Sequence, residues 1–217
     1  MTFDLFGDIC TARREPESLG PGAVLLPGLA APQTSSLMAA IKSVTERAPF
    51  RNMTTPGGYR MSVAMTNCGA AGWVTDPSGY RYAAVDPDSG LRWPAMPSAL
   101  SDLAADASAR AGFPGFAPDA CLINLYEPGA RLSLHQDKNE RDYAAPIVSV
   151  SLGLPAVFLF GGTRRAERAR RVPLAHGDVV VWGGPARLRY HGVQPLKDGE
   201  HAVLGRYRVN LTFRVAL

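Results

Sequence analysis

Residues 120–137, ACLINLYEPGARLSLHQD, contain a mainly apolar run and a run in which polar and apolar side chains alternate, separated by Pro128 and Gly129. The first run covers 120–126 and the second covers 131–137. Alternation is typical of β-strands, because successive side chains point to opposite faces of a sheet. A Pro-Gly pair is typical of a turn. This stretch therefore predicts two neighbouring strands.

Short runs of this kind, separated by turn residues, continue to the end of the chain. Further short strands are predicted at 147–152, 156–160, 171–174, 178–182, 187–191 and 206–215. No helical periodicity separates them. A series of short strands joined by turns favours an antiparallel sandwich or jelly roll.

The N-terminal half has a different pattern. Apolar residues at spacings of three and four predict one helix over about Gln33 to Arg47 and a second over about Ser98 to Ala111. An alternating segment from Tyr59 to Thr66 predicts a strand, and a stretch rich in Gly and Pro follows it. We therefore predict an α+β fold, with a double-stranded β-helix (jelly roll) core over about 115–217 and covering helices.

The composition is that of an ordinary globular protein. The 217 residues are 46% hydrophobic and 19% charged, with a formal net charge of +4 and three widely spaced cysteines. We expect a single domain over 1–217 with a loosely attached arm at about 1–21. Because no signal-like segment or long apolar run is present, we expect a cytoplasmic protein without a membrane-spanning segment. The mild basic excess is compatible with a polyanionic partner.

The segment 131–137 also suggests a metal site. His135 and Asp137 have the same parity, so their side chains share one face of the predicted strand. Of the other histidines, His176 precedes a predicted turn and His201 lies in a polar loop, which leaves His191 as the best third ligand. Two histidines and a carboxylate form the facial triad of non-haem iron oxygenases. The same ligand types also hold catalytic zinc, so this motif alone leaves both metals open.

The last predicted strand distinguishes the two metals. One face of it is apolar, and the other carries Arg208, Asn210, Thr212 and Arg214. Arginine binds carboxylates through paired hydrogen bonds, and 2-oxoglutarate has two carboxylates. The strand 120–126 adds Leu122, Asn124 and Tyr126 on one face. A zinc hydrolase has no use for an arginine-lined second pocket, so iron with an oxo-acid cosubstrate is the better interpretation.

Several long segments between about residues 50 and 214 carry unusual residue combinations. They are FRNMTTPGGYRMSVAMTNCG, RWPAMP, PDACLINLYEPGARLSLHQDKNE, APIVSVSLGLPAVF, HGDVVVWGG, YHGVQPL and NLTFR. In these segments the chain closely resembles the AlkB family of Fe(II)- and 2-oxoglutarate-dependent DNA-alkylation repair dioxygenases. The resemblance implies a β-helix core beneath a nucleotide-recognition lid at about 50–97.

The resemblance also implies a role for particular residues. The metal would be Fe(II), with 2-oxoglutarate and O2 as cosubstrates. The implied iron ligands are His135, Asp137 and His191. The implied 2-oxoglutarate contacts are Arg208, Asn210 and Tyr126 at the distal carboxylate, with Asn124 and Arg214 near the keto-acid end. The implied substrate contacts are Trp73, Tyr80 and Tyr82 in the lid, Met65 and Leu122 near the base pocket, and Arg165 on a loop.

The implied activity is oxidative removal of alkyl groups from bases such as 1-methyladenine and 3-methylcytosine, with release of aldehyde, succinate and CO2. The implied partner is single-stranded DNA, with RNA and double-stranded DNA as further partners, and we expect a monomer. The alternatives are a hydroxylase or demethylase of a protein or small molecule, and a non-catalytic binding protein. The aromatic flap and the five arginines of residues 164–171 favour nucleic acid.

One position departs from the family pattern. The residues after the iron-binding aspartate read Lys-Asp-Glu in the family, whereas here they read Lys138-Asn139-Glu140. An amide can donate and accept hydrogen bonds but carries no charge. We therefore expect weaker discrimination in favour of cationic bases than in a relative with aspartate.

Overall fold

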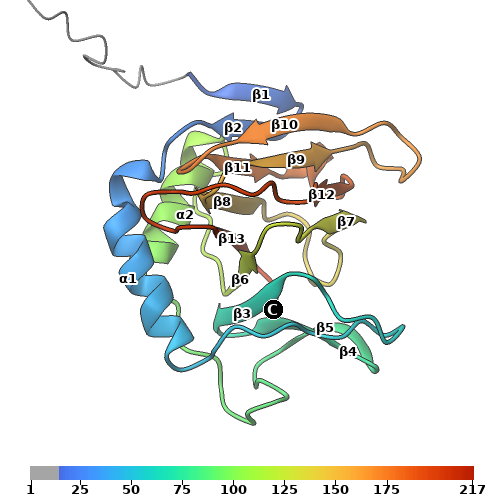
Figure 1. Ribbon diagram of the computed structural model, residues 1–217. Helices are drawn as coiled ribbons and strands as arrows, with labels where there is room; N and C mark the ends of the chain where they lie inside the picture. Colours follow the sequence, from blue (N-terminus) through green and yellow to red (C-terminus); the bar gives the residue numbers. More distant parts are fainter. Residues whose placement is uncertain (1–14) are drawn as a thin grey trace, which may run out of the picture.

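The computed structural model describes residues 15–217, and two antiparallel sheets dominate it (Figure 1). The larger sheet contains, in spatial order, β1 (Glu17–Gly20), β2 (Ala23–Leu26), β11 (Val179–Trp182), β8 (Ile147–Gly153), β13 (Arg208–Arg214), β6 (Ala120–Tyr126) and β3 (Ala64–Gly69). The smaller sheet contains β10 (Arg170–Leu174), β9 (Ala156–Phe160), β12 (His191–Val193) and β7 (Leu132–His135). A separate hairpin contains β4 (Gly72–Asp76) and β5 (Gly79–Ala83).

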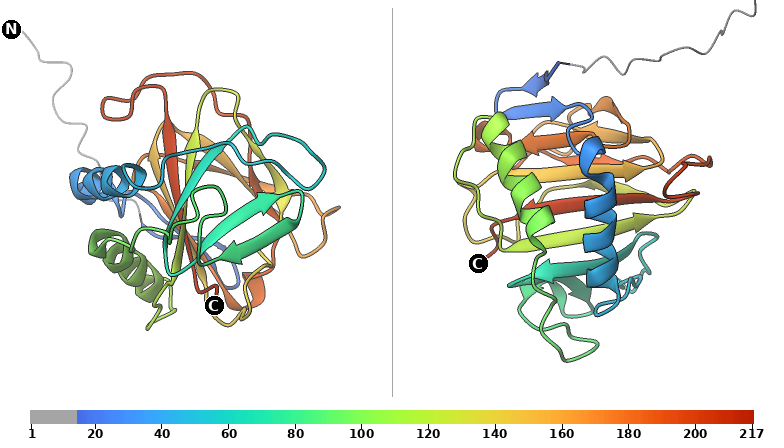
Figure 2. Two further views of the ribbon diagram at one scale, coloured as in Figure 1. Left: turned by 90° about the horizontal axis from the view of Figure 1, so that it is seen from below. Right: turned by 90° about the vertical axis from the view of Figure 1, so that its left-hand side faces the viewer.

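Two helices, α1 (Thr34–Thr45) and α2 (Ser98–Arg110), lie side by side over the outer face of the larger sheet (Figure 2, right). Val209, Leu211 and Phe213 of β13 pack with these helices in one apolar cluster. The alternate residues of β13 are also buried, on the inner face between the sheets. Both faces of this strand are therefore covered, and its polar residues line the interior of the jelly roll.

The predicted fold class is confirmed, with both helices and most strands near their predicted positions. Three strand predictions need correction. Of residues 59–66, only 64–66 belong to β3, because the turn at Pro56 brings Thr54 opposite Arg60 in an isolated bridge. The strand predicted over 131–137 ends at His135.

The strand predicted over 187–191 is wrong in most of its length. Residues Gly184–Ala186 form a 3-10 turn, and the backbone amide of Arg189 donates to the carbonyl of Ala186 (3.0 Å). His191 therefore begins β12 instead of ending a strand. Residues 187–190, Arg-Leu-Arg-Tyr, alternate polar with apolar and so mimic a strand, although their backbone continues a tight turn.

The N-terminal predictions have mixed outcomes. Residues 1–14 of the predicted arm lie outside the described residues. Residues 17–20 form β1, which pairs with β2, so this part of the predicted arm belongs to the larger sheet. Within the predicted lid, β3 belongs to the larger sheet, and the β4–β5 hairpin lies at the opposite end of the molecule from β1 (Figure 1). No helix among residues 15–217 is long and apolar enough to span a membrane.

Candidate metal and cosubstrate site

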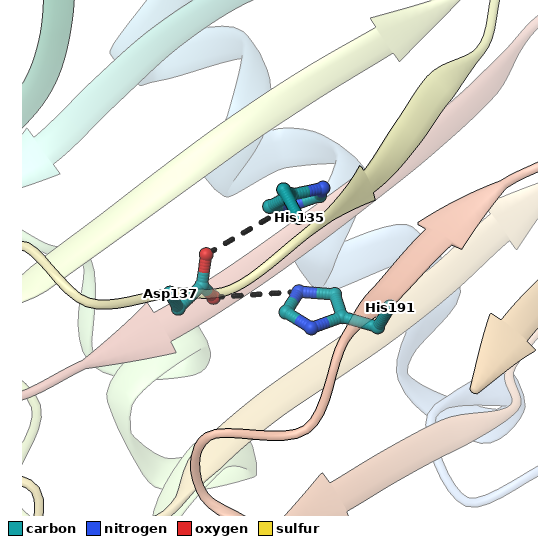
Figure 3. A group of neighbouring side chains, drawn as sticks. All are labelled: His135, Asp137 and His191. Carbon is teal, nitrogen blue, oxygen red and sulfur yellow. Dashed lines mark ion pairs between the residues drawn. The ribbon is translucent and has the colours of Figure 1, made fainter. Parts of the chain in front are cut away.

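The two predicted histidine ligands lie on adjacent strands of the smaller sheet. His191 of β12 is directly opposite His135 of β7 in the register of the two strands, and their ring centroids are 4.4 Å apart. Asp137 follows β7 and turns its carboxylate between them (Figure 3). Its Oδ1 lies 3.7 Å from His135 Nε2, and its Oδ2 lies 3.7 Å from His191 Nε2. The ligand atoms of the three residues all lie within 4.8 Å of one another, which suits a single metal ion.

Hydrogen bonds fix which nitrogen of each histidine is free. Nδ1 of His135 lies 2.8 Å from the carbonyl of Ser133, and Nδ1 of His191 lies 3.1 Å from the carbonyl of Arg189. A carbonyl oxygen can only accept, so Nδ1 carries the proton in both rings. Nε2 is then left with a lone pair toward Asp137, as metal binding requires.

Burial and charge also keep the ligands in metal-binding form. Burial and the neighbouring His135 lower the pKa of His191 to about 4, so its ring is neutral near pH 7. Burial alone would raise the pKa of Asp137, but Arg214 and the two histidines outweigh it and hold that pKa below its usual range. Arg214 donates to Asp137 Oδ2 from Nη2 (2.6 Å) and from Nε (2.9 Å). Asp137 is therefore an oriented anion.

The predicted cosubstrate residues lie on two paired strands next to this cluster. Arg208 of β13 is opposite Tyr126 of β6, and Asn210 is opposite Asn124. The guanidinium carbon of Arg208 lies 4.8 Å from the centroid of the Tyr126 ring. Asn124 donates to Asn210 Oδ1 (3.1 Å). The structure thus brings these four predicted residues together in the interior.

The polar atoms of this group are incompletely satisfied by the described residues. Arg208 is only 1% exposed, and its Nη2 donates to Ser151 Oγ (2.7 Å). Its Nε and Nη1, the Tyr126 hydroxyl and Asn124 Oδ1 have no hydrogen-bond partner within residues 15–217. A buried guanidinium without a carboxylate is costly, so the donor set fits an anionic ligand such as one carboxylate of 2-oxoglutarate.

The predicted lid residues gather on the β4–β5 hairpin. Trp73 is opposite Tyr82 in the strand register, and the rings of Trp73 and Tyr80 stack with centroids 5.7 Å apart. The Trp73 indole donates to Asn139 Oδ1 (3.2 Å), and the Tyr82 hydroxyl donates to Glu140 Oε1 (2.7 Å). The aromatic hairpin is therefore attached to the loop that immediately follows Asp137.

The remaining predicted substrate residues occupy different surroundings. Met65 of β3 and Leu122 of β6 are buried in the interior apolar cluster that also contains Tyr126. Arg165 is exposed on the loop between β9 and β10, with its guanidinium carbon 6.0 Å from the centroid of the Tyr190 ring. Tyr190 immediately precedes His191, so this contact places Arg165 beside the neighbour in sequence of a metal ligand.

Sequence reasoning missed several buried polar residues of this region. Glu140 and Arg187 form an ion pair with 3.1 Å between Oε2 and Nη2. The hydroxyls of Ser149 and Ser151 of β8 accept hydrogen bonds from Asn210 and Arg208, respectively. Each of these contacts joins residues far apart in the chain, so no local pattern predicts it. The serines could have been noticed as the polar positions of an otherwise apolar strand.

Comparison with known proteins supports a metal and 2-oxoglutarate site in this protein. The pattern of the 2OG-Fe(II) oxygenase superfamily matches residues 22–214. The chain is 56% identical to alpha-ketoglutarate-dependent dioxygenase AlkB of Salmonella typhimurium over 98% of this chain and 97% of the relative. It is 55% identical to the Escherichia coli AlkB with the same coverage, and 44% identical to a Caulobacter vibrioides AlkB homolog over 93% of this chain and 91% of that relative.

Solved structures of other proteins share the fold of this chain. The structure of OsALKBH1 superposes with a TM-score of 0.81 at 30% identity, over 93% of this chain and 100% of that one. A Burkholderia pseudomallei 2OG-Fe(II) family oxidoreductase shares the fold at 20% identity, with a TM-score of 0.56 over 88% and 84% of the two chains. The chain therefore belongs to the 2OG-Fe(II) oxygenase superfamily, as an AlkB-type dioxygenase that depends on Fe(II), 2-oxoglutarate and O2.

Proposed function

We propose that this enzyme removes alkyl groups oxidatively from the ring nitrogens of nucleic-acid bases, with 1-methyladenine and 3-methylcytosine as typical substrates. The observation that carries this proposal is the attachment of an aromatic hairpin to the loop after Asp137 through Trp73 and Tyr82. A flat base held beside Trp73 and Tyr80 would lie close to the metal ligands. Relatives in the comparison include a tRNA demethylase of Schizosaccharomyces pombe and a nucleic acid dioxygenase of mouse.

The protein's own part in the reaction is to bind and orient. His135, Asp137 and His191 would hold Fe(II), which together with 2-oxoglutarate activates O2 and supplies the oxidant when bound. Arg208, Tyr126 and Asn210 would bind the distal carboxylate, with Asn124 at the keto-acid end. Arg214 is engaged by Asp137, so we propose that it acts there mainly by orienting the metal ligand.

The substrate must be presented with its base out of the stack, because the alkylated nitrogen lies on the pairing edge. Trp73, Tyr80 and Tyr82 are the proposed lid contacts, above a base pocket lined by Met65 and Leu122. Single-stranded nucleic acid needs no unpairing, so single-stranded DNA and RNA are the proposed preferred substrates, with double-stranded DNA used less well. We propose that the enzyme acts as a cytoplasmic monomer.

Exposed arginines offer a path for the phosphate backbone. Within residues 164–171, Arg164 pairs with Glu167 and Arg170 pairs with Glu17, while Arg165 and Arg168 project from the same loop. The cationic side chains of this run that have no carboxylate partner among residues 15–217 can neutralise phosphates, and such binding weakens as salt rises.

The test is release of formaldehyde from a single-stranded oligonucleotide that contains one 1-methyladenine. We expect stoichiometric formaldehyde and succinate, and no formaldehyde from the unmethylated oligonucleotide or from an N-methylated peptide. Formaldehyde from the peptide but not from the oligonucleotide would overturn the proposal in favour of a protein demethylase.

A further inference from the structure

Glu140 lies at the centre of a buried polar cluster next to the metal ligands. Its side chain is 1% exposed, and both carboxylate oxygens are in use. Oε2 pairs with Arg187 Nη2 at 3.1 Å, and Oε1 lies 3.5 Å from Arg214 Nε. Oε1 also accepts a hydrogen bond from the Tyr82 hydroxyl at 2.7 Å.

Both arginine partners of Glu140 also hold Asp137. Arg187 Nη1 donates to the backbone carbonyl of Asp137 (2.8 Å), and Arg214 Nη2 donates to its carboxylate (2.6 Å). Asp137, Glu140, Arg187 and Arg214 are all buried, and their charges balance. In such a network each group restricts the orientation of the others, because a lost partner leaves a buried charge unpaired.

The third partner of Glu140 comes from outside this cluster. Tyr82 belongs to β5 of the hairpin, which is not part of either large sheet. Burial raises the pKa of Tyr82 well above its usual value, so the hydroxyl keeps its proton and donates. On the solvent side, Asn139 accepts from the Trp73 indole (3.2 Å) and donates to the Tyr80 carbonyl (3.4 Å). Residues 139 and 140 thus hold both strands of the hairpin.

We propose that Glu140 is a positioning residue that couples the seating of the β4–β5 hairpin to the orientation of Asp137. The route runs from Tyr82 to Glu140, and from Glu140 through Arg187 and Arg214 to the backbone and carboxylate of Asp137. Coupling between two sites is reciprocal, so metal binding orders the hairpin as much as the seated hairpin favours metal binding. This inference rests on the proposed role of Asp137 as a metal ligand.

The experiment uses Co(II) as a probe for the metal site and hydrogen exchange of the β4–β5 backbone amides as the readout. In the full-length wild-type protein, we expect Co(II) to slow exchange in residues 72–83 by about fivefold or more. In Tyr82→Phe we expect the ratio of rates with and without Co(II) to approach one. The Co(II) dissociation constant should rise by the same factor. Tyr59→Phe, an equal change at an exposed tyrosine outside this network, should behave as wild type.

A second variant, Glu140→Gln, keeps an acceptor for Tyr82 but removes the charge that both arginines share. We expect weaker Co(II) binding and an altered visible absorption spectrum of bound Co(II), which reports the ligand geometry. Tyr82→Phe leaves every buried charge paired. It therefore still tests the coupling if Glu140→Gln fails to fold.

The outcomes separate this inference from the metal-site assignment. Equal slowing by Co(II) in wild type and Tyr82→Phe, with loss of Co(II) binding in Asp137→Ala, would overturn the coupling and leave the metal site intact. Undiminished Co(II) binding in Asp137→Ala would overturn both.

Discussion

Arg208 and Arg214 occupy the same face of β13, but their surroundings give them different roles. Arg214 is paired with Asp137, and this pairing raises its pKa against the opposing effect of burial. Arg208 has no acidic partner among residues 15–217, and burial lowers its pKa. A buried guanidinium of this kind gains most from an anionic ligand, whereas Arg214 already has its counter-charge.

Arg208→Ala should raise the 2-oxoglutarate concentration needed for half-maximal turnover roughly 100-fold, because it removes the charged partner of a buried carboxylate, on the order of 3 kcal/mol. Arg208→Lys should recover only part of this loss, since an ammonium cannot reproduce the paired hydrogen bonds. The measurement is the KM for 2-oxoglutarate. Arg206→Ala is the control, because Arg206 is exposed and pairs with Asp198. Equal KM values in all four proteins would contradict the role of Arg208.

Asn139→Asp tests the departure from the family pattern. Aspartate can still accept from the Trp73 indole but can no longer donate to the Tyr80 carbonyl, and it adds a negative charge beside the hairpin. Bases alkylated at a pairing nitrogen, such as 1-methyladenine, are cationic. We expect the variant to favour 1-methyladenine over neutral 3-methylthymine more strongly than the wild type does, by up to about tenfold. The measurement is the ratio of kcat/KM values in matched oligonucleotides. An unchanged ratio would mean that residue 139 does not face the base.

At the scale of secondary-structure elements, the hairpin and the smaller sheet supply different parts of the site. β7 and β12 place two histidines opposite each other, and this register is fixed by backbone pairing. The hairpin is hydrogen-bonded to residues 139 and 140 through the side chains of Trp73 and Tyr82 and the backbone carbonyl of Tyr80. A change confined to Trp73 can therefore alter substrate binding while the paired histidines remain in place.

Trp73→Ala should lower kcat/KM for a methylated oligonucleotide by roughly 10- to 100-fold, because stacking on an aromatic ring contributes about 1–3 kcal/mol per base. The 2-oxoglutarate KM should not change, since the hydrogen bonds of Trp73 are to Asn67 and Asn139 and not to the polar residues around Arg208. Steady-state kinetics with each substrate varied in turn would measure both. A matching rise in the 2-oxoglutarate KM would instead show that Trp73 supports the interior of the fold.

At the scale of the whole molecule, the sequence predicts the jelly roll and the pairing of His135 with Asp137 from local alternation, whereas it yields His191 only by elimination among the four histidines. His135 and Asp137 share a strand parity, and residues 208–214 alternate without exception. Glu140 and Arg187 are 47 positions apart, and their pairing depends on how β7 and the turn before β12 meet in space. The same reason explains why β2 was missed, since its partner β11 lies far along the chain, and β1 pairs in turn with β2.

The metal-free protein should lose stability in mild acid because His191 is buried and neutral. Its pKa falls from 6.5 to about 4 on folding, so the folded state binds fewer protons than the unfolded state. Its contribution is therefore complete above pH 6.5 and is lost as pH falls toward 4, by about 2 kcal/mol between pH 7 and pH 5. Urea unfolding at these two pH values should show this loss in the wild type and a smaller loss in His191→Gln. Identical pH dependence of the two proteins would contradict the burial argument.

The central claim is that His135, Asp137 and His191 hold the iron with which this enzyme repairs alkylated bases. The most direct measurement is mass-spectrometric conversion of 1-methyladenine to adenine in a single-stranded oligonucleotide, with Fe(II) binding measured in parallel. The wild type should convert the base and form one succinate per repaired base. Each of His135→Ala, Asp137→Ala and His191→Ala should abolish conversion and weaken Fe(II) binding, while His201→Ala should retain both. Conversion retained by His191→Ala, with loss in His201→Ala, would contradict the account.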